Sequence, residues 1–138
     1  MQKLSKYRHI HCVGIGGIGL SAIAEVFLKR GYWVSGSDLK PGEVTERLKA
    51  QGALIFSDHD ENNIQGADLV VYSSAVSTDN PELAAAGRNG IPIVTRAEVL
   101  GALMKEFNQS IAVSGTHGKT TTTSMISLIL ENSGCDPT

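Results

Sequence analysis

The fold is decided by the stretch HIHCVGIGGIG at residues 9–19. An apolar, strand-like run leads directly into Gly14, Gly16 and Gly19, which form the pattern GxGxxG, and a helical pattern follows. The first glycine permits a tight turn, the second lets a phosphate approach the backbone, and the third lets helix and strand pack closely. Free N–H groups at the start of the helix attract an anion. The stretch predicts a strand, loop and helix that bind a diphosphate-bearing ligand.

Working outward, short apolar runs rich in β-branched residues alternate with segments of helical period, which is typical of βαβ units around a parallel sheet. Strands are expected at 9–14, 33–37, 54–56, 69–73, 91–94 and 111–114, and helices at 18–30, 44–51, 81–89, 97–105 and 119–132. Gly31 is expected to cap the first helix, and Asn80 with Pro81 to begin the third. The fold class is therefore α/β, a Rossmann-like parallel sheet with helices on both faces.

Asp38 ends the second expected strand, 24 residues after Gly14. An acidic side chain at this place commonly accepts hydrogen bonds from a ribose hydroxyl. Together with the glycine loop, Asp38 suggests a dinucleotide. The alternative, that the glycines serve only a tight turn and Asp38 caps a loop, stays open.

A second anion loop lies near the C-terminus, where Gly115-Thr116-His117-Gly118-Lys119-Thr120-Thr121 follows an apolar run and opens a helix. Backbone donors, the Lys119 ammonium for the β and γ phosphates and the Thr120 hydroxyl for magnesium are the parts of a phosphate-binding loop. The usual GxxxxGK[ST] spacing would need glycine at Val113, so this is a shortened variant. An ordinary dehydrogenase has no use for a second such loop.

Composition narrows the class of protein further. The chain has 138 residues, enough for one complete domain, and a net charge of -2 without the basic excess of a nucleic-acid binder. No apolar run approaches the ~18 residues that span a bilayer, and no signal peptide is visible, so a cytoplasmic protein is expected. Cys12 and Cys135 lack metal-ligand or disulfide spacing, and Cys12 is expected to be a small buried strand residue.

The chain resembles the Mur ligase family of peptidoglycan synthesis, and most closely its alanine-adding branch. The likeness covers essentially the whole chain. It rests on the glycine loop with the preceding residues 9–11, on residues 36–38, 73–75, 80–82 and 96–98, and on the run GTHGKTTTT at 115–123.

The resemblance implies a domain at 1–107 that holds a UDP-sugar, followed at 108–138 by the start of a central ATP-binding domain. This second part would be the first strand, phosphate loop and helix of a truncated P-loop ATPase domain. ATP with Mg²⁺, UDP-N-acetylmuramate and L-alanine are the implied cofactors and substrates, and an acyl phosphate is the implied intermediate. The residues implied to bind the UDP-sugar are Gly14, Gly16, Gly17, Ile18, Gly19, Asp38, Ser73 and Ser74.

In the second loop the resemblance implies a catalytic role for Lys119 and a metal ligand in Thr120. His117 is expected either to contact substrate or phosphate or to shape the loop, whereas His9, His11 and His59 have no metal-ligand spacing and are expected to be structural. The chain departs from the family by stopping one helix after the loop. The fragment is therefore expected to bind UDP-sugar without catalysing the reaction, and its unpartnered tail is expected to be mobile, to fold back or to self-associate.

Two other interpretations stay open. One is a regulatory NAD-binding Rossmann domain, favoured by GxGxxG and Asp38 and opposed by the second loop. The other is the family branch that recycles murein tripeptide, whose glycine loop is expected to carry cysteine at the position of Gly16.

Overall fold

The structure, a computed structural model, describes residues 4–137. It divides into two compact units, Met1–Glu106 and Phe107–Thr138. The division falls at the beginning of the polar stretch 106–110.

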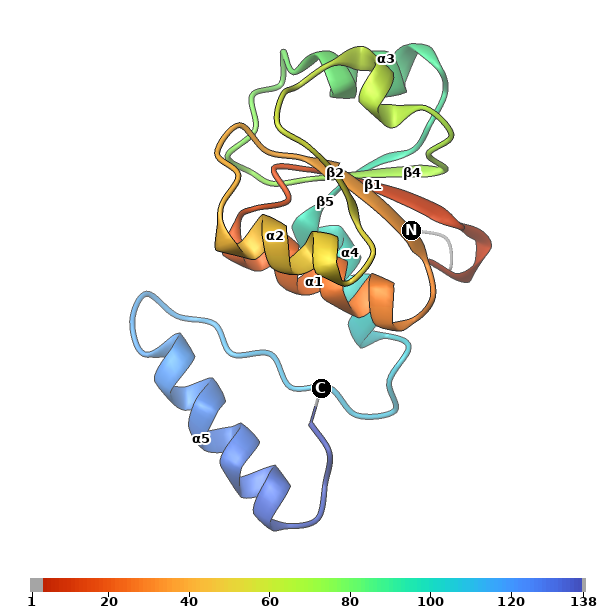
Figure 1. The fold of residues 1–138 in the computed structure, drawn as a ribbon. Coiled ribbons are helices and arrows are strands. Elements are labelled where there is room, and N and C mark those ends of the chain that lie inside the picture. Colours follow the sequence, from red (N-terminus) through yellow and green to blue (C-terminus); the bar gives the residue numbers. More distant parts are fainter. Residues whose placement is uncertain (1–3, 138) are drawn as a thin grey trace. The chain divides into compact units, whose positions relative to one another are not determined.

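The first unit is built on one five-stranded sheet in which every pairing is parallel (Figure 1). The strands are β1 (His9–Val13), β2 (Trp33–Ser37), β3 (Leu54–Phe56), β4 (Leu69–Tyr72) and β5 (Ile93–Thr95). Their spatial order is β3-β2-β1-β4-β5. Strands β2 and β3 therefore lie on one side of β1, and β4 and β5 lie on the other, so the strand order reverses between the neighbours β1 and β4. In open α/β sheets, ligands bind at the carboxyl ends of the strands at such a point.

Helices cover both faces of this sheet. In Figure 1, α1 (Ile18–Lys29), α2 (Glu43–Ala50) and α4 (Arg96–Met104) lie on one face and α3 (Pro81–Arg88) on the other. Two short 3-10 helices, η1 (Leu4–Lys6) and η2 (Glu61–Ile64), complete the unit, and η2 packs against α3. This arrangement confirms the expected Rossmann-like α/β class.

Alternation along the strands divides the interior into two layers. Ile10 and Cys12 of β1 join the larger apolar cluster with Leu20, Phe27 and other residues of α1, α2 and α4. A smaller apolar cluster on the α3 face contains Val13, Ile64, Val70, Leu83, Ala85 and Ala86. Cys12 is fully buried, as expected, and burial raises the pKa of its thiol to about 12.

Local signals explain where the helices begin. The Asn80 side chain accepts hydrogen bonds from the N–H groups of Glu82 and Leu83, and Pro81 occupies the first turn. Helix α1 ends one residue earlier than expected, with Gly31 at a φ of 80° directly after the Arg30 cap. The sequence analysis missed both 3-10 helices. It expected β5 to begin two residues and to end one residue earlier than observed.

The second unit contains one helix, α5 (Lys119–Asn132), at the expected bounds. The strand expected at 111–114 is wrong, because these residues have no regular secondary structure. A strand needs a partner for its backbone groups, and the described residues of the second unit supply none. No residue of α5 is buried, and Met125, Leu128 and Ile129 are exposed. None of the helices within residues 4–137 has the length and apolar character that a membrane crossing requires.

Candidate functional site

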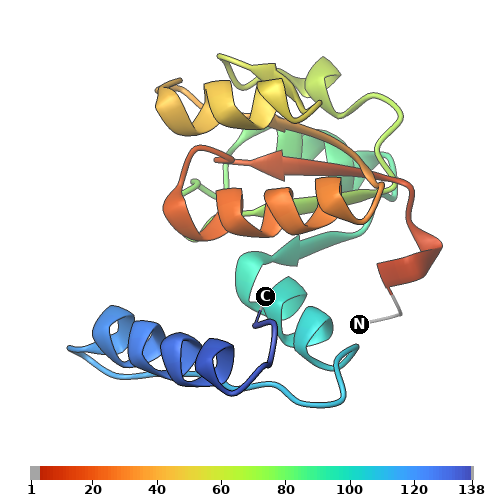
Figure 2. The same cartoon turned by 60° about the horizontal axis from the view of Figure 1, so that its bottom comes forward.

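The glycine loop leaves β1 at its carboxyl end and turns back into α1, as the red strand and orange helix of Figure 2 show. Gly14 has a φ of 79°, a conformation that a side chain disfavours. The N–H groups of Gly14 and Ile15 both donate to the Ser37 carbonyl, at 2.8 and 3.1 Å. The loop is therefore fastened to the end of the neighbouring strand β2.

Asp38 lies directly against this loop. Its Oδ2 accepts the N–H of Gly16 at 2.8 Å, and its Oδ1 accepts the N–H of Lys40 at 2.9 Å. A Cβ added to Gly16 would stand 2.7 Å from Oδ2, so a larger residue there would have to displace the Asp38 carboxylate. Each carboxylate oxygen keeps further acceptor capacity, which a ligand hydroxyl can use.

The first turn of α1 remains open for an anion. Gly17 caps the helix without a side-chain hydrogen bond, and within residues 4–137 the N–H groups of Ile18 and Gly19 have no hydrogen-bond partner. Ile18 is 88% exposed. Unpaired N–H groups at a helix N-terminus carry the positive end of the helix dipole, so this turn can bind a phosphate.

The loop after β4 lies on the other side of the glycine loop. The Ser73 N–H donates to the Val13 carbonyl at 3.1 Å, and a Cβ on Gly14 would lie 3.3 Å from Ser73 Cβ. Ser74 follows and is exposed. The predicted substrate residues of β1, β2 and β4 therefore all lie at one edge of the sheet.

Arg96 was not among the predicted site residues, although it lies beside them. It is the first residue of α4, and a Cβ on Gly19 would lie 3.0 Å from its Cδ and 3.2 Å from both Nε and Nη1. Its position directly after β5 could have indicated this place in the sequence analysis, because β5 ends at the same edge of the sheet.

A chain of polar side chains crosses the α3 face beneath this edge. Ser35 Oγ lies 2.7 Å from His9 Nε2 and 2.8 Å from His11 Nδ1. His11 Nε2 lies 3.2 Å from Oε1 of Glu82, which is fully buried. The exposed Trp33 ring stacks on His9 with centroids 4.4 Å apart.

The Glu82 carboxylate lies at the centre of these contacts. Oε2 accepts the Ser37 hydroxyl at 2.6 Å and lies 2.8 Å from His59 Nδ1, and Oε1 accepts the Asn63 amide at 3.0 Å. Burial works to raise the pKa of the Glu82 carboxyl, but the hydrogen bonds from His11, Ser37 and Asn63 outweigh it and lower that pKa. An ionised carboxylate can only accept hydrogen bonds, so His11 Nε2 is the donor in its contact with Glu82 and carries a proton.

These contacts give the three histidines structural partners. Burial lowers the pKa of His9. Within residues 4–137, no group of three or more His, Cys, Asp or Glu side chains has the arrangement of a metal site.

The second loop has a helix start of the kind that receives phosphate. Gly118 adopts a left-handed conformation with a φ of 76°, and Thr122 N–H bonds back to its carbonyl. The Lys119 ammonium turns back to donate to the Gly115 carbonyl. The N–H groups of Lys119, Thr120 and Thr121 have no acceptor among the described residues.

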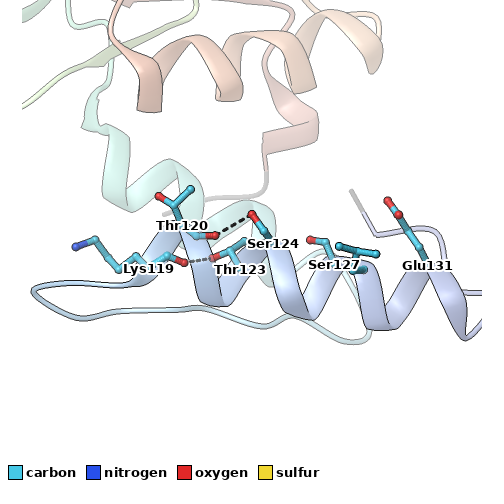
Figure 3. A pocket seen from close by; sticks show the side chains of 7 residues that line it. Lys119, Thr120, Thr123, Ser124, Ser127 and Glu131 are labelled. Atoms are coloured by element: carbon cyan, nitrogen blue, oxygen red, sulfur yellow. Dashed lines mark hydrogen bonds between the residues drawn. The ribbon is translucent and has the colours of Figure 1, made fainter.

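Polar side chains continue from this loop along α5 and line a shallow groove. Lys119, Thr120, Thr123, Ser124, Ser127, Leu128 and Glu131 border it (Figure 3). The hydroxyls of Thr123 and Ser124 donate to the carbonyls of Lys119 and Thr120. The predicted Gly115, Thr116 and His117 form the exposed turn before the helix.

The backbone donors and the ammonium of this loop fit a polyphosphate. Thr120 supplies one hydroxyl for a magnesium ion, and the other ligands of an octahedral ion would be phosphate oxygens, water and groups outside the described residues.

Comparison with known proteins gives a consistent result. Residues 9–108 match the family model described as "Mur ligase family, catalytic domain". The chain is 54% identical over 134 residues to a UDP-N-acetylmuramate–L-alanine ligase of Acetivibrio thermocellus, covering 97% of this chain and 29% of that protein. A ligase of the same name from Laribacter hongkongensis is 58% identical over 133 residues, covering 96% and 28%. The chain thus spans less than a third of the length of these relatives.

Solved structures give the same fold. The UDP-N-acetylmuramate-alanine ligase of Thermotoga maritima superposes with a TM-score of 0.83 at 40% identity, covering 91% of this chain and 29% of that one. The UDP-N-acetylmuramate:L-alanyl-gamma-D-glutamyl-meso-diaminopimelate ligase of Neisseria meningitides gives 0.85 at 30% identity, covering 92% and 40%.

Proposed function

This chain belongs to the Mur ligase family, and we propose that it is the N-terminal part of an ATP-dependent ligase. The ligase joins L-alanine to the carboxylate of UDP-N-acetylmuramate in peptidoglycan synthesis, in the cytoplasm. Identity of 54–58% along nearly the whole chain to relatives of that name is the observation that carries this proposal. The murein tripeptide branch, represented by a structure at 30% identity, is less well supported, and Gly16 argues against it.

The first unit would bind the UDP part of the substrate. The open turn at Ile18 and Gly19 supplies N–H donors for the diphosphate. The Asp38 carboxylate accepts a hydroxyl of the ribose, and Ser73 and Ser74 line the same edge. The domain at 1–107 is therefore the substrate-holding domain of this proposal.

The loop at 115–121 would bind ATP at the start of the central domain. ATP with its magnesium ion supplies the phosphoryl group that converts the substrate carboxylate into an acyl phosphate, with ADP leaving. Lys119 would neutralise charge on the β and γ phosphates, the backbone N–H groups at the start of α5 would hold phosphate oxygens, and the Thr120 hydroxyl would be a ligand of the magnesium ion. The alanine amine then displaces phosphate.

The exposed apolar side chains of α5 would be covered in a longer protein by the remainder of the central domain. In the 138-residue chain alone this uncovered face favours self-association. Sedimentation of the chain over a range of concentrations checks it.

Gly16→Val tests the UDP site of the first unit. The valine side chain would enter the space of the Asp38 carboxylate, 2.7 Å from the added Cβ, and displace it from the loop. Calorimetric titration of UDP-N-acetylmuramate should show at least a tenfold loss of affinity (about 1.4 kcal/mol). Gly87→Val on the exposed part of α3, where an added Cβ meets nothing within 4 Å, is the matched control. Unchanged affinity in a folded Gly16→Val chain would place the ligand elsewhere.

A further inference from the structure

Four buried side chains, His9, Ser35, His11 and Glu82, form a histidine row on the α3 face of the sheet. His9 and His11 are two residues apart on β1 and so lie on the same face, and Ser35 is paired with His11 in the register of β1 and β2. Contacts of 2.7, 2.8 and 3.2 Å join the four in that order. None is more than 4% exposed. The row has no part in the UDP binding or phosphoryl transfer proposed above.

The Ser35 hydroxyl determines the direction of the hydrogen bonds in this row. A hydroxyl has one proton, so Ser35 can donate to only one of the two imidazole nitrogens and must accept from the other. His11 Nε2 carries a proton for the ionised Glu82 carboxylate, so Nδ1 of a neutral His11 ring is an acceptor. Ser35 therefore donates to His11 Nδ1, and His9 Nε2–H donates to Ser35.

This direction leaves Nδ1 of His9 as a lone pair. Within residues 4–137, His9 Nδ1 is a buried side-chain nitrogen without a hydrogen-bond partner. It lies beside Gly66, where an added Cβ would be 3.7 Å away. The His9 ring also stacks on the exposed Trp33, so this end of the row is near the surface. His9 Nδ1 is therefore the atom at which the row can take up a proton.

We propose that the histidine row is a pH-sensitive proton relay, in which one proton taken up at His9 Nδ1 reverses both hydrogen bonds of Ser35 and leaves the positive charge on His11. The proton from solvent binds His9 Nδ1, the Nε2 proton of His9 moves to Ser35 Oγ, and the former Ser35 proton moves to His11 Nδ1. His9 ends neutral, Ser35 donates to His9 Nε2, and His11 holds both ring protons beside the Glu82 carboxylate. This inference is independent of the proposed function.

The charges around the row favour His11 as the place where the proton rests. An imidazolium at His11 faces the buried Glu82 carboxylate at 3.2 Å, where opposite charges interact strongly. The acidic group near His9 is Asp68, which is exposed to solvent and accepts the backbone N–H groups of Arg8 and His9. Solvent screens a charge at that place.

Other titratable groups lie around the row and bear on its pH dependence. The groups that face the row, or that contact its hydrogen-bond partners, from the neighbouring elements are Arg8, Asp58, His59 and Asp68. His59 Nδ1 lies 2.8 Å from Glu82 Oε2, so its ring has to be followed separately. Burial lowers the pKa of His9, so proton uptake is expected below about pH 6.5.

The test follows the ring nitrogens of each histidine by ¹⁵N NMR in the 138-residue chain between pH 8.5 and pH 5. At the alkaline end, His9 and His11 should both carry their proton on Nε2. On acidification, the His9 proton should move to Nδ1 while His11 gains a second proton, with one common midpoint. If His9 becomes doubly protonated while His11 stays neutral, if the two rings have separate midpoints, or if neither ring changes before the chain unfolds, the inference is wrong.

Variants test the link through Ser35 and the charge of Glu82. Ser35→Ala removes the bridging hydroxyl, so His9 and His11 should then titrate with separate midpoints. Ser21→Ala, which removes another buried serine hydroxyl, on α1, is the matched control and should keep the common midpoint. Glu82→Gln removes the negative charge beside His11 and should lower the midpoint by about one pH unit or more.

Amide dispersion in the same spectra checks that each variant is folded. A common midpoint that survives in a folded Ser35→Ala chain would overturn the relay. If Ser35→Ala does not fold, the positions of the ring protons in the wild-type chain still decide. No ligand is used in these measurements, so their failure would leave the proposed function unchanged.

Discussion

His11 Nε2 and Glu82 Oε1 lie 3.2 Å apart, and both side chains are completely buried between β1 and α3. The contact joins residues that are 71 positions apart in sequence. Glu82 also accepts the hydroxyl of Ser37, the residue whose carbonyl fastens the glycine loop and which precedes Asp38. The buried Glu82 carboxylate is thus connected to the proposed ligand site through Ser37, the last residue of β2.

Removal of the Glu82 carboxylate should lower the free energy of unfolding. Glu82→Ala leaves His11, Ser37 and Asn63 without their acceptor in a buried place, so the free energy of unfolding should fall by about 3 kcal/mol. Glu82→Gln keeps an acceptor oxygen and should cost less. Glu61→Gln, which breaks an exposed pair with Arg88, should change stability by less than about 1 kcal/mol. Urea unfolding measures all three, and equal losses in Glu82→Ala and Glu61→Gln would contradict the account.

Stability should fall as the solution becomes acidic. The lowered pKa of His9 means that the unfolded chain binds its proton first, so the loss begins below about pH 6.5. The lowered pKa of Glu82 adds a second loss, which begins near pH 4.3 and continues down to the folded pKa. Urea unfolding between pH 8 and pH 3 should therefore show a plateau above pH 7 and a decline below it. A rise in stability from pH 7 to pH 5 would contradict these assignments.

Much of the fold was predictable because its signals are local. The apolar runs with their alternation, the Asn80-Pro81 pair and the glycine loop each act within a few residues, and they placed five strands and five helices close to their observed bounds. The prediction of a strand at 111–114 was wrong for the opposite reason. Its apolar run is strand-like, but a strand exists only where another strand pairs with it.

The site was predictable only in part. Motif spacing identified Gly16 and Asp38, but not that the carboxylate already accepts the Gly16 N–H. Arg96 and Glu82 reach the site or its supporting network through α4 and α3, 80 and 66 residues after Gly16. Contacts of this kind depend on how helices pack on the sheet, which no pattern within one segment encodes.

The 138-residue chain should not hydrolyse ATP. Lys119 and the start of α5 can hold phosphates, but no metal-binding cluster of His, Cys, Asp or Glu occurs within residues 4–137 to position magnesium. Phosphate release at high protein concentration should equal the background, both in the wild type and in Lys119→Ala. Hydrolysis that disappears in Lys119→Ala would show that the loop is catalytic without further groups.

The most direct test of the central claim is a side-by-side titration of the 138-residue chain with UDP-N-acetylmuramate and with NADH, followed by backbone amide NMR. We predict saturable shifts with UDP-N-acetylmuramate that centre on Gly16 to Gly19 and on Asp38, and no saturable shifts with NADH. Saturable binding of NADH at these residues, with none by UDP-N-acetylmuramate, would contradict the account and favour a dinucleotide-binding domain.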